Sequence, residues 1–467
     1  MVIMLRFFLC SAFNKQKQKI KPMKTQRFTK FILGLALCLI MAGSAHAQFN
    51  DWKPYPTTTS PSEKKDSTRG HVWGYAFGSA YDKVHADSVN ATGASPKTGT
   101  TQYSGVPKNF DALSFQRIYL GYDYFFNNKF SAHIVLAHEE FYDGGSTAAT
   151  KDNIDNTGDR IMYIKYCNFE WDNIFKGSNL TVGAIVTPSF PTTEEPFWGY
   201  RSLERTIMDM RGIVSSNDVG INLGGKFWSQ KDASGKENAC IGYNIMVGNN
   251  TNATPDNTGI TAADIENFKR YYGNVYGKFL NDKILVDFYS DYHTVTPGQN
   301  DLVWRGIVGY KEKNWNISAE YFNEGMSNQA VITAGPGLSK NDTTNIARSG
   351  FSFEGAITLL RDKNTDAPKF GLVARYDMYN PDGNFNANNT YLSSSKATNS
   401  NFAYSGANAF TENFFMFAVD YQPIKQIHIM PNIWYDGFSN RTEGVTGLAK
   451  SDYDMVARIT FYFTFNK

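Results

Sequence analysis

Two alternating stretches decide the fold of this chain, V182-G-A-I-V-T-P188 and D218-V-G-I-N-L-G-G-K-F-W228. Successive side chains of a strand point to opposite faces, so each stretch can be divided into two faces. In the second stretch one face is apolar, with Val219, Ile221, Leu223 and Phe227. The opposite face is polar, with Asp218, Asn222 and Lys226. A strand of this kind is typical of a wall between lipid and water.

The insert between these strands, residues 189–217, is too long for a hairpin turn. It carries three aromatic rings, Phe197, Trp198 and Tyr200. It also carries charges of both signs, namely Glu194, Glu195, Arg201, Glu204, Arg205 and Arg211. An exposed loop does not require this combination. We therefore expect residues 188–216 to fold inward behind the wall, with the rings packed against it and the six charges at a pore constriction.

The first 47 residues have the pattern of an exported protein. Three basic residues precede an apolar run, and the small-residue sequence A45-H-A47 follows it. The run is too short for a helix to span ~30 Å of hydrocarbon. The sequence predicts a secretory signal peptide that starts at Met23 and is cleaved before Gln48, with residues 1–22 as an overextended start.

The charge of the mature chain argues against a general nucleic-acid binder. Residues 1–47 contain eight basic residues and no acidic ones. Removing these eight from the 46 basic residues leaves 38 against 44 acidic residues, so the net charge changes from +2 to −6. Nucleic-acid binding requires basic clusters, and we expect none after cleavage.

Beyond the signal, the apolar residues alternate rather than cluster. No apolar run reaches the length of about 18 residues that a membrane-spanning helix needs. Yet 15% of the chain is aromatic, as in a sheet with one apolar face. Two cysteines remain, Cys167 and Cys240, in strands that we expect to be separated by two others. We expect both to be unpaired, because the chain has no disulfide or metal-binding spacing.

Sixteen segments alternate in this way, and the connections between them are short and long in turn. The predicted strands are 71–82, 115–126, 129–140, 159–171, 179–187, 217–228, 239–248, 269–279, 283–293, 302–311, 314–323, 347–360, 369–379, 411–421, 426–436 and 452–465. An even strand number with short turns at one end and long loops at the other indicates a bacterial outer-membrane barrel. A soluble sandwich or propeller fits this pattern poorly.

Backbone groups in lipid must all be paired, so such a sheet has to close. We therefore predict an all-β fold, a transmembrane antiparallel β-barrel of about sixteen strands over residues 71–467. Residues 48–70 are polar and rich in Pro and Ser, which predicts a flexible periplasmic lead-in.

Residues Pro188 to Arg205 and Asp218 to Phe227 resemble the phosphate-selective porin O and P family and related porin-like barrels. The matching residues read P188-S-F, then E195-P-F-W-G-Y-R-S-L-E-R205, then D218-V-G-I-N-L-G-G-K-F227. The resemblance implies a trimer, a long third external loop folded inward, and arginines along the solute route. It also implies a preference for anions or phosphate. The negative net charge of the mature chain departs from that pattern.

Charged residues on the polar faces of the strands would line the interior. We predict six pore-lining residues, Arg117, Asp123, Asp218, Arg305, Arg375 and Arg458, with Arg160 and Arg270 as further candidates. Guanidinium groups bind phosphate or carboxylate through forked hydrogen bonds, so a row of arginines could form an anion path. The same face also carries the acids Glu139, Asp287, Glu320, Glu354, Asp377, Asp420 and Asp436. The alternative is that these ions pair with one another across a polar lumen.

Two functions remain open. The first is an outer-membrane porin for passive diffusion of small polar or charged solutes. Its expected partners are outer-membrane lipid and lipopolysaccharide, the barrel-assembly machinery, the solutes or ions themselves, and further copies in a homotrimer. The second is a surface-binding module or adhesin that uses loops 83–114 and 380–410.

Catalysis and metal binding are not expected. Glu194 and Glu195 are paired carboxylates, but nearby arginines in the sequence can neutralise their charge. The stretch D152-N-I-D-N-T-G-D159 is similar to a calcium loop but lacks the terminal Glu. The sequence therefore predicts no enzyme, no cofactor and no metal.

Overall fold

In the computed structural model the described residues are 70–87, 103, 106–139, 161–232, 235, 237–250, 269–296, 298–333, 342–384, 390–391, 411–439 and 452–465. The chain divides into a unit of residues 1–44 and a unit of residues 45–467, and all described residues belong to the second. The predicted leader (1–47), almost all of the lead-in (48–70) and Arg160 lie outside the described residues.

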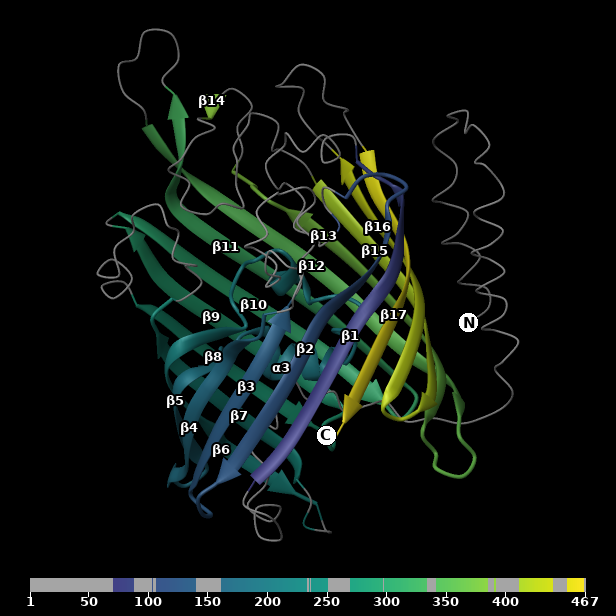
Figure 1. Ribbon diagram of the computed structural model, residues 1–467. Helices are drawn as coiled ribbons and strands as arrows, with labels where there is room; N and C mark the ends of the chain where they lie inside the picture. Colours follow the sequence, from purple (N-terminus) through teal and green to yellow (C-terminus); the bar gives the residue numbers. More distant parts are fainter. Residues whose placement is uncertain are drawn as a thin grey trace. The chain divides into compact units, whose positions relative to one another are not determined.

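Among the described residues, sixteen long strands and one two-residue strand form a single sheet, which Figure 1 shows. Their bounds are β1 (Gly70–His85), β2 (Asp111–Phe125), β3 (Phe130–Glu139), β4 (Tyr163–Phe175), β5 (Ser178–Val186), β6 (Asn217–Lys231), β7 (Glu237–Gly248), β8 (Arg270–Phe279), β9 (Ile284–Thr296), β10 (Gln299–Glu312), β11 (Trp315–Thr333), β12 (Asp342–Arg361), β13 (Pro368–Asn380), β14 (Thr390–Tyr391), β15 (Thr411–Ile424), β16 (Ile427–Ser439) and β17 (Asp452–Phe465).

The sheet closes on itself because β1 pairs with both β2 and β17. Gly74 of β1 lies opposite Leu120 of β2 and opposite Phe465 of β17. Consecutive long strands pair antiparallel around the whole ring. Closure pairs the strand edges, as a sheet in lipid requires. The predicted all-β antiparallel barrel is confirmed.

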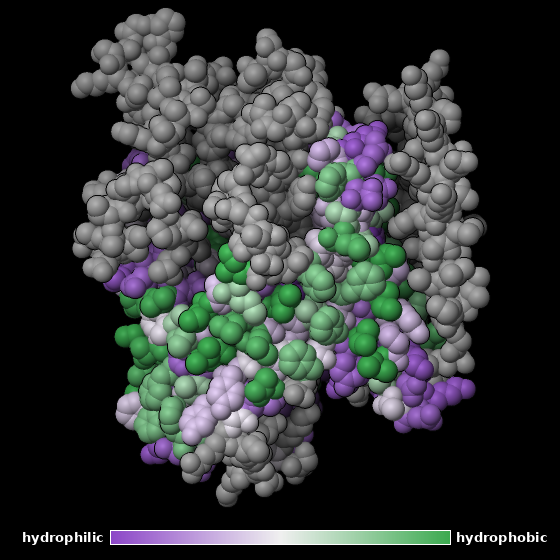
Figure 2. Space-filling view, in the orientation of Figure 1, coloured by the Kyte–Doolittle hydropathy of each residue, from purple (hydrophilic) through white to green (hydrophobic). Residues whose placement is uncertain are grey.

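The outer face carries the apolar belt that the alternation predicted. Ile221 and Phe227 of β6 are 53% and 63% exposed, whereas Asp218 on the other face is buried. Figure 2 shows hydrophobic side chains gathered over the middle of one outer face. A closed barrel of sixteen long strands with such a belt lies in the outer membrane of a bacterium.

The hairpin of β11 and β12 is longer than the sequence predicted. The expected long connection 324–346 is mostly strand, because β11 runs to Thr333 and β12 begins at Asp342. Met326 lies opposite Ile346, and after an irregularity Ala330 lies opposite Thr344. Backbone pairing continues here without the apolar alternation by which strands were recognised. The start of β4 also moves, from residue 159 to Tyr163.

Two clusters of buried apolar side chains lie on the inner side of the barrel. The first includes four residues of β1, Trp73, Tyr75, Phe77 and Tyr81, together with residues of β15 to β17. The second draws on β5, β7 to β11 and β13. Both clusters also contain residues from the segment between β5 and β6. The barrel interior at this level is therefore packed by side chains from several directions.

The two cysteines of the described residues are free, as predicted. Cys167 of β4 is exposed and Cys240 of β7 is buried. Strands β5 and β6 separate them in the sheet.

Candidate functional site

The segment of residues 187–216 connects β5 to β6, and its two ends lie side by side. Val186 is directly opposite Asn217 in the β5–β6 pairing. The backbone N–H of Thr187 donates to the carbonyl of Ser216 at 3.1 Å, and its hydroxyl donates to the carbonyl of Ser215 at 2.6 Å. The segment is thus an insertion into an otherwise regular hairpin.

Two short helices shape this segment, α3 (Phe190–Trp198) and α4 (Ile207–Met210). Pro191 lies in the first turn of α3, where its fixed φ suits the helix. It ends at Gly199, which adopts a left-handed φ of 79° and donates its N–H to the carbonyl of Glu195 at 2.9 Å. Among the described residues, no helix combines the length and apolar character needed to cross a membrane.

One side of the segment is bound to strands β9 to β11. Arg305 of β10 donates to Glu194 at 2.9 Å and also pairs with Asp287 of β9. Thr193 donates its hydroxyl to the same Asp287 carboxylate at 2.5 Å. The amide of Asn316 in β11 donates to the carbonyl of Phe197 at 3.0 Å. An arginine of the inner wall therefore holds α3 through a buried ion pair.

The opposite side of the segment is bound to strands β13 to β17. Two wall arginines donate to its backbone carbonyls: Arg375 to Arg205, and Arg458 to Leu203. Trp434 of β16 donates its indole N–H to Glu204 at 3.2 Å. Two side chains of the segment also contact residues of β15.

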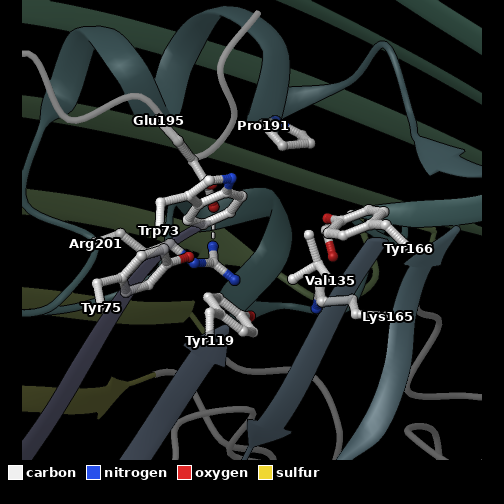
Figure 3. A pocket seen from close by; sticks show the side chains of 10 residues that line it. Trp73, Tyr75, Tyr119, Val135, Lys165, Tyr166, Pro191, Glu195 and Arg201 are labelled. Atoms are coloured by element: carbon white, nitrogen blue, oxygen red, sulfur yellow. Dashed lines mark ion pairs between the residues drawn. The ribbon is translucent and has the colours of Figure 1, made fainter. Parts of the chain in front are cut away.

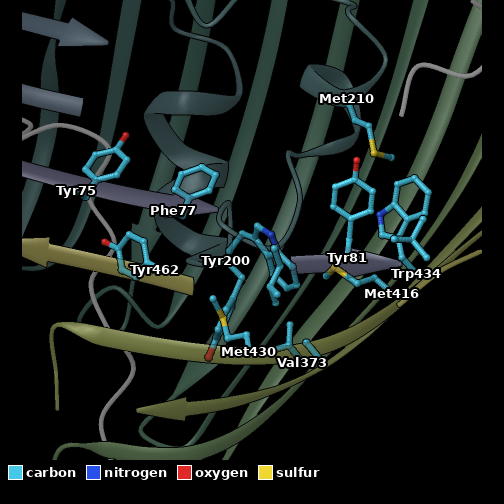
Figure 4. Close-up of a cluster of buried hydrophobic side chains, with 14 of the residues drawn as sticks. Tyr75, Phe77, Tyr81, Tyr200, Met210, Val373, Met416, Met430, Trp434 and Tyr462 are labelled. Atoms are coloured by element: carbon cyan, nitrogen blue, oxygen red, sulfur yellow. The ribbon is translucent and has the colours of Figure 1, made fainter. Parts of the chain in front are cut away.

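Tyr200 and Arg211 make these contacts with β15. The hydroxyl of Tyr200 donates to Asp420 at 3.3 Å, and Arg211 pairs with Glu412. Figure 4 shows Tyr200 among side chains of β1 and of the C-terminal strands. Together with the bonds to β9, β10 and β11, these contacts tie the segment to widely separated parts of the wall.

Arg201 lies where the segment meets β1 and β2. It pairs with Glu195 and, at 2.5 Å, with Asp209, both from the same segment. Figure 3 shows the Arg201–Glu195 pair beside the rings of Trp73, Tyr75 and Tyr119. A cavity of about 20 Å³ remains between them. Such a volume holds about one water molecule, so the cavity belongs to the packing and has no room for a solute.

Burial and pairing shift the pKa values of the acids in the segment. Burial raises the pKa of Glu194, although the nearby charge of Arg305 opposes this. Burial also disfavours the ionised form of Asp209. There the charges of Arg201 and Arg205 outweigh it and hold the pKa of Asp209 below its ordinary value. The pKa of Glu194 is thus raised and that of Asp209 is lowered, although both residues lie in the same segment.

The six predicted constriction residues are brought together, and most of them form pairs. Glu194 pairs with the wall, Glu195 with Arg201, and Arg211 with the wall, while Glu204 accepts the Trp434 bond. Arg205 lies 3.7 Å from Glu204. We predicted that Arg201, Arg205 and Arg211 face acids across the pore. In the structure they lie in direct contact with acids instead.

The predicted pore-lining residues are all buried on the inner side. Arg117 pairs with Glu139 at 2.5 Å, and Arg375 pairs with Asp377 at 2.7 Å. Asp123 accepts from Trp73 at 3.0 Å and contacts His133 at 2.8 Å, and Asp218 accepts from Tyr272 at 2.7 Å. Arg270, a further candidate, pairs with Asp291 at 2.6 Å. These contacts match the interpretation in which the charged residues pair with one another, rather than the one in which arginines form an anion path.

Comparisons with known proteins give the following likenesses. No family model and no curated protein matches the chain. It is similar to the outer-membrane OmpT of Vibrio cholerae, at 11% identity over 86% of this chain and 99% of that one, with a TM-score of 0.46. It is also similar to an anion-selective porin from Comamonas acidovorans, at 11% identity over 85% of this chain and 99% of that one, with a TM-score of 0.47. A third likeness is to the outer-membrane channel DcaP of Acinetobacter baumannii, at 8% identity over 85% of this chain and 97% of that one, with a TM-score of 0.48.

The chain forms a porin-like barrel. Strand number, antiparallel order and closure establish this. The phosphate-selective family stays a prediction.

Several residues of the site were missed by the reasoning from sequence. Glu412 pairs with Arg211, Asp209 with Arg201, and Lys165 with Glu139 at 2.6 Å. Glu412 could have been found, because it shares a strand face with Asp420 at even spacing. Asp209 lies in a segment without strand periodicity, so alternation gave no signal for it. Within the described ranges, no group of three or more His, Cys, Asp or Glu is placed to hold a metal ion.

Proposed function

We propose that the chain is an outer-membrane channel for passive diffusion of small polar or charged solutes, constricted by an inward-folded segment of residues 187–216. The observation that supports this most is the set of bonds from the segment to the inner faces of β9, β10, β11, β13, β15, β16 and β17. A segment bound to so many strands narrows the passage between them. Its position would limit the size of the solute.

The charged wall supports transport rather than catalysis. Glu194 and Glu195 are engaged by Arg305 and Arg201, so these carboxylates serve as structural ion pairs. A polar inner face with weak interactions lets solutes enter and leave, as conduction requires. We propose no enzymatic role for the site.

The finer features implied by the family resemblance remain proposals. They are a homotrimer, contacts with outer-membrane lipid and lipopolysaccharide, delivery by the barrel-assembly machinery, and a preference for anions or phosphate. Chemical cross-linking of the detergent-extracted protein tests the trimer: a ladder ending at three copies supports it, and a monomer alone contradicts it. The sign of the charge preference is considered separately below.

Planar bilayers and liposome swelling test the proposed channel. Purified protein should produce discrete conductance steps, and liposomes that contain it should swell in small neutral sugars but not in large ones. A folded barrel that gives neither steps nor swelling would contradict the proposal. That result would favour the alternative function as an adhesin. Most of the contact loops of that alternative, 83–114 and 380–410, lie outside the described residues.

A further inference from the structure

Acidic side chains outnumber basic ones in the interior. Among the described residues, twenty-one Asp or Glu side chains are buried, against eleven Lys or Arg. The outer face of the barrel meets lipid, so these charges lie on the inner wall, in the segment between β5 and β6, or near the strand ends. Their sum is strongly negative if they are ionised. This balance is opposite to what an anion path needs.

Nearly all of the buried bases are already neutralised by a partner. Ten of the eleven form an ion pair with a carboxylate: Lys83, Arg117, Lys165, Arg201, Arg211, Arg270, Arg305, Arg348, Arg361 and Arg375. The eleventh, Arg458, donates to the neutral groups Asn432, Tyr103 and the Leu203 carbonyl. Little positive charge is therefore left to attract an anion.

Glu320 and Asp436 are buried acids that form no ion pair among the described residues. Among the described residues, the only hydrogen-bonding neighbour of Glu320 in β11 is the carboxyl of Glu194, and the only one of Asp436 in β16 is the carboxyl of Glu412. Glu320 is 3% exposed and Asp436 is fully buried. A buried charge without a donor is costly, so each group requires water, a proton or a cation.

The surroundings of Asp436 increase this requirement. It lies directly opposite Asp454 of β17 in the antiparallel register, and like charges in that relation repel. Lys83 compensates Asp454 at 2.7 Å through the oxygen Oδ1. The other oxygen of Asp454 has no hydrogen-bond partner among the described residues. The neighbours of Asp436 are thus the carboxyls of Glu412 in β15 and Asp454 in β17, with Arg211 of the segment also close to it.

Glu320 has a comparable environment beside the segment. Its neighbours include the carboxyls of Glu194 in α3 and Glu354 in β12. The residue opposite it is Ser352, whose hydroxyl donates to Asp377 at 2.6 Å instead. One oxygen of Glu354 is likewise without a partner among the described residues. Arg305 lies nearby, but it already pairs with Glu194 and Asp287.

We propose that the channel passes small cations in preference to anions, and that Glu320 and Asp436 are residues that determine this selectivity. The proposal rests on the channel function proposed above and specifies its solute class. Neither residue belongs to a metal-chelating group within the described part of the chain. Because both side chains are buried, they act on a diffusing ion through their negative charge, which lowers the free energy of a cation in the passage without binding it directly. The anion preference implied by the family resemblance would then not apply to this chain.

Reversal potentials in a KCl gradient test this proposal. The wild-type channel should give a potential of the sign expected for K⁺ selectivity. Glu320→Gln and Asp436→Asn should each lower the ratio of K⁺ to Cl⁻ permeability by about twofold or more, because each removes a negative charge at nearly constant shape. Asp362→Asn is the matched control. It removes the same charge from a turn between β12 and β13 and should leave the ratio unchanged.

The outcomes separate the two proposals. A channel that conducts with the sign of Cl⁻ selectivity, or with no selectivity, overturns this inference and leaves the channel function standing. A folded barrel without any conductance overturns both. Equal permeability ratios in the wild type and both folded lumen variants would remove Glu320 and Asp436 from the selectivity determinants. If either variant fails to fold, the sign of the wild-type potential still decides whether cations are preferred.

Discussion

A glycine of the wall leaves space for a ring of the inserted segment, and filling that space should displace the segment. Gly309 lies on the inner face of β10, the same face that carries Arg305. A Cβ at this position would lie 2.5 Å from Cζ of Phe197, whereas ordinary contact begins at 3.4 Å. Gly309→Val therefore forces the ring of Phe197, and α3 with it, away from the wall. Such overpacking costs about 1–3 kcal/mol.

A double-mutant cycle separates this clash from a general effect on the strand. Phe197→Ala alone should destabilise the protein, since the buried ring contributes about 1.5–3 kcal/mol. In the double variant the valine occupies space that the ring has vacated. The two effects should then fall short of additivity by roughly 0.5–3 kcal/mol. Urea unfolding, followed by heat-modifiable gel mobility, measures all four free energies.

The control for this experiment is Gly306→Val on the same strand. A Cβ at Gly306 would meet no atom within 4 Å, so this substitution should couple to Phe197→Ala by almost nothing. Conductance gives a second readout, because a displaced segment should alter the single-channel steps of Gly309→Val but not those of Gly306→Val. Additive free energies for the Gly309 and Phe197 pair would refute the contact between α3 and β10.

Three further predictions concern the belt, the segment charges and pH. Ile459 is flanked by the buried residues Arg458 and Thr460 and faces outward, so Ile459→Lys should cost about 2–4 kcal/mol near the bilayer centre; folded yield equal to that of Ile459→Val would count against this. The double variant Arg201→Glu/Arg205→Glu should shift the reversal potential toward cations, and an unchanged potential would exclude these arginines from the constriction. Because the pKa of Asp209 is lower in the folded state than its ordinary 3.8, its stabilisation is present above that pH and is lost as the pH falls through the folded value. Urea unfolding at a series of acidic pH values should show less of this loss in Asp209→Asn, and identical pH profiles would contradict the assignment.

Strand alternation was enough to predict the barrel. The faces of β6 and β17 follow the apolar periodicity, because lipid on one side and a polar interior on the other impose it at every second residue. Beyond the lipid-facing part of the strands this periodicity is lost, and the strand ends could not be predicted. The extensions of β11 after Asn323 and of β12 before Ala347 are held by backbone pairing, which leaves no apolar pattern to recognise.

The interior could be predicted only in part. Alternation identified Arg305 as an inner residue, but its partner Glu194 lies 111 residues away in the inserted segment. Arg211 and Glu412 are 201 residues apart, and only closure of the barrel brings them together. The aromatic inner face of β1 is a second example. Tyr75 and Phe77 turn inward there and belong to one buried apolar cluster with Trp198 and Leu203 of the segment.

The central claim is that residues 187–216 narrow the passage through the barrel. Because Val186 and Asn217 lie directly opposite each other, an Asn-Gly turn can replace the whole segment and close the hairpin of β5 and β6. Single-channel conductance of this variant, once heat-modifiable mobility has shown a folded barrel, should exceed that of the wild type, and larger neutral sugars should enter liposomes that contain it. A folded barrel with the wild-type conductance and size limit would contradict the claim.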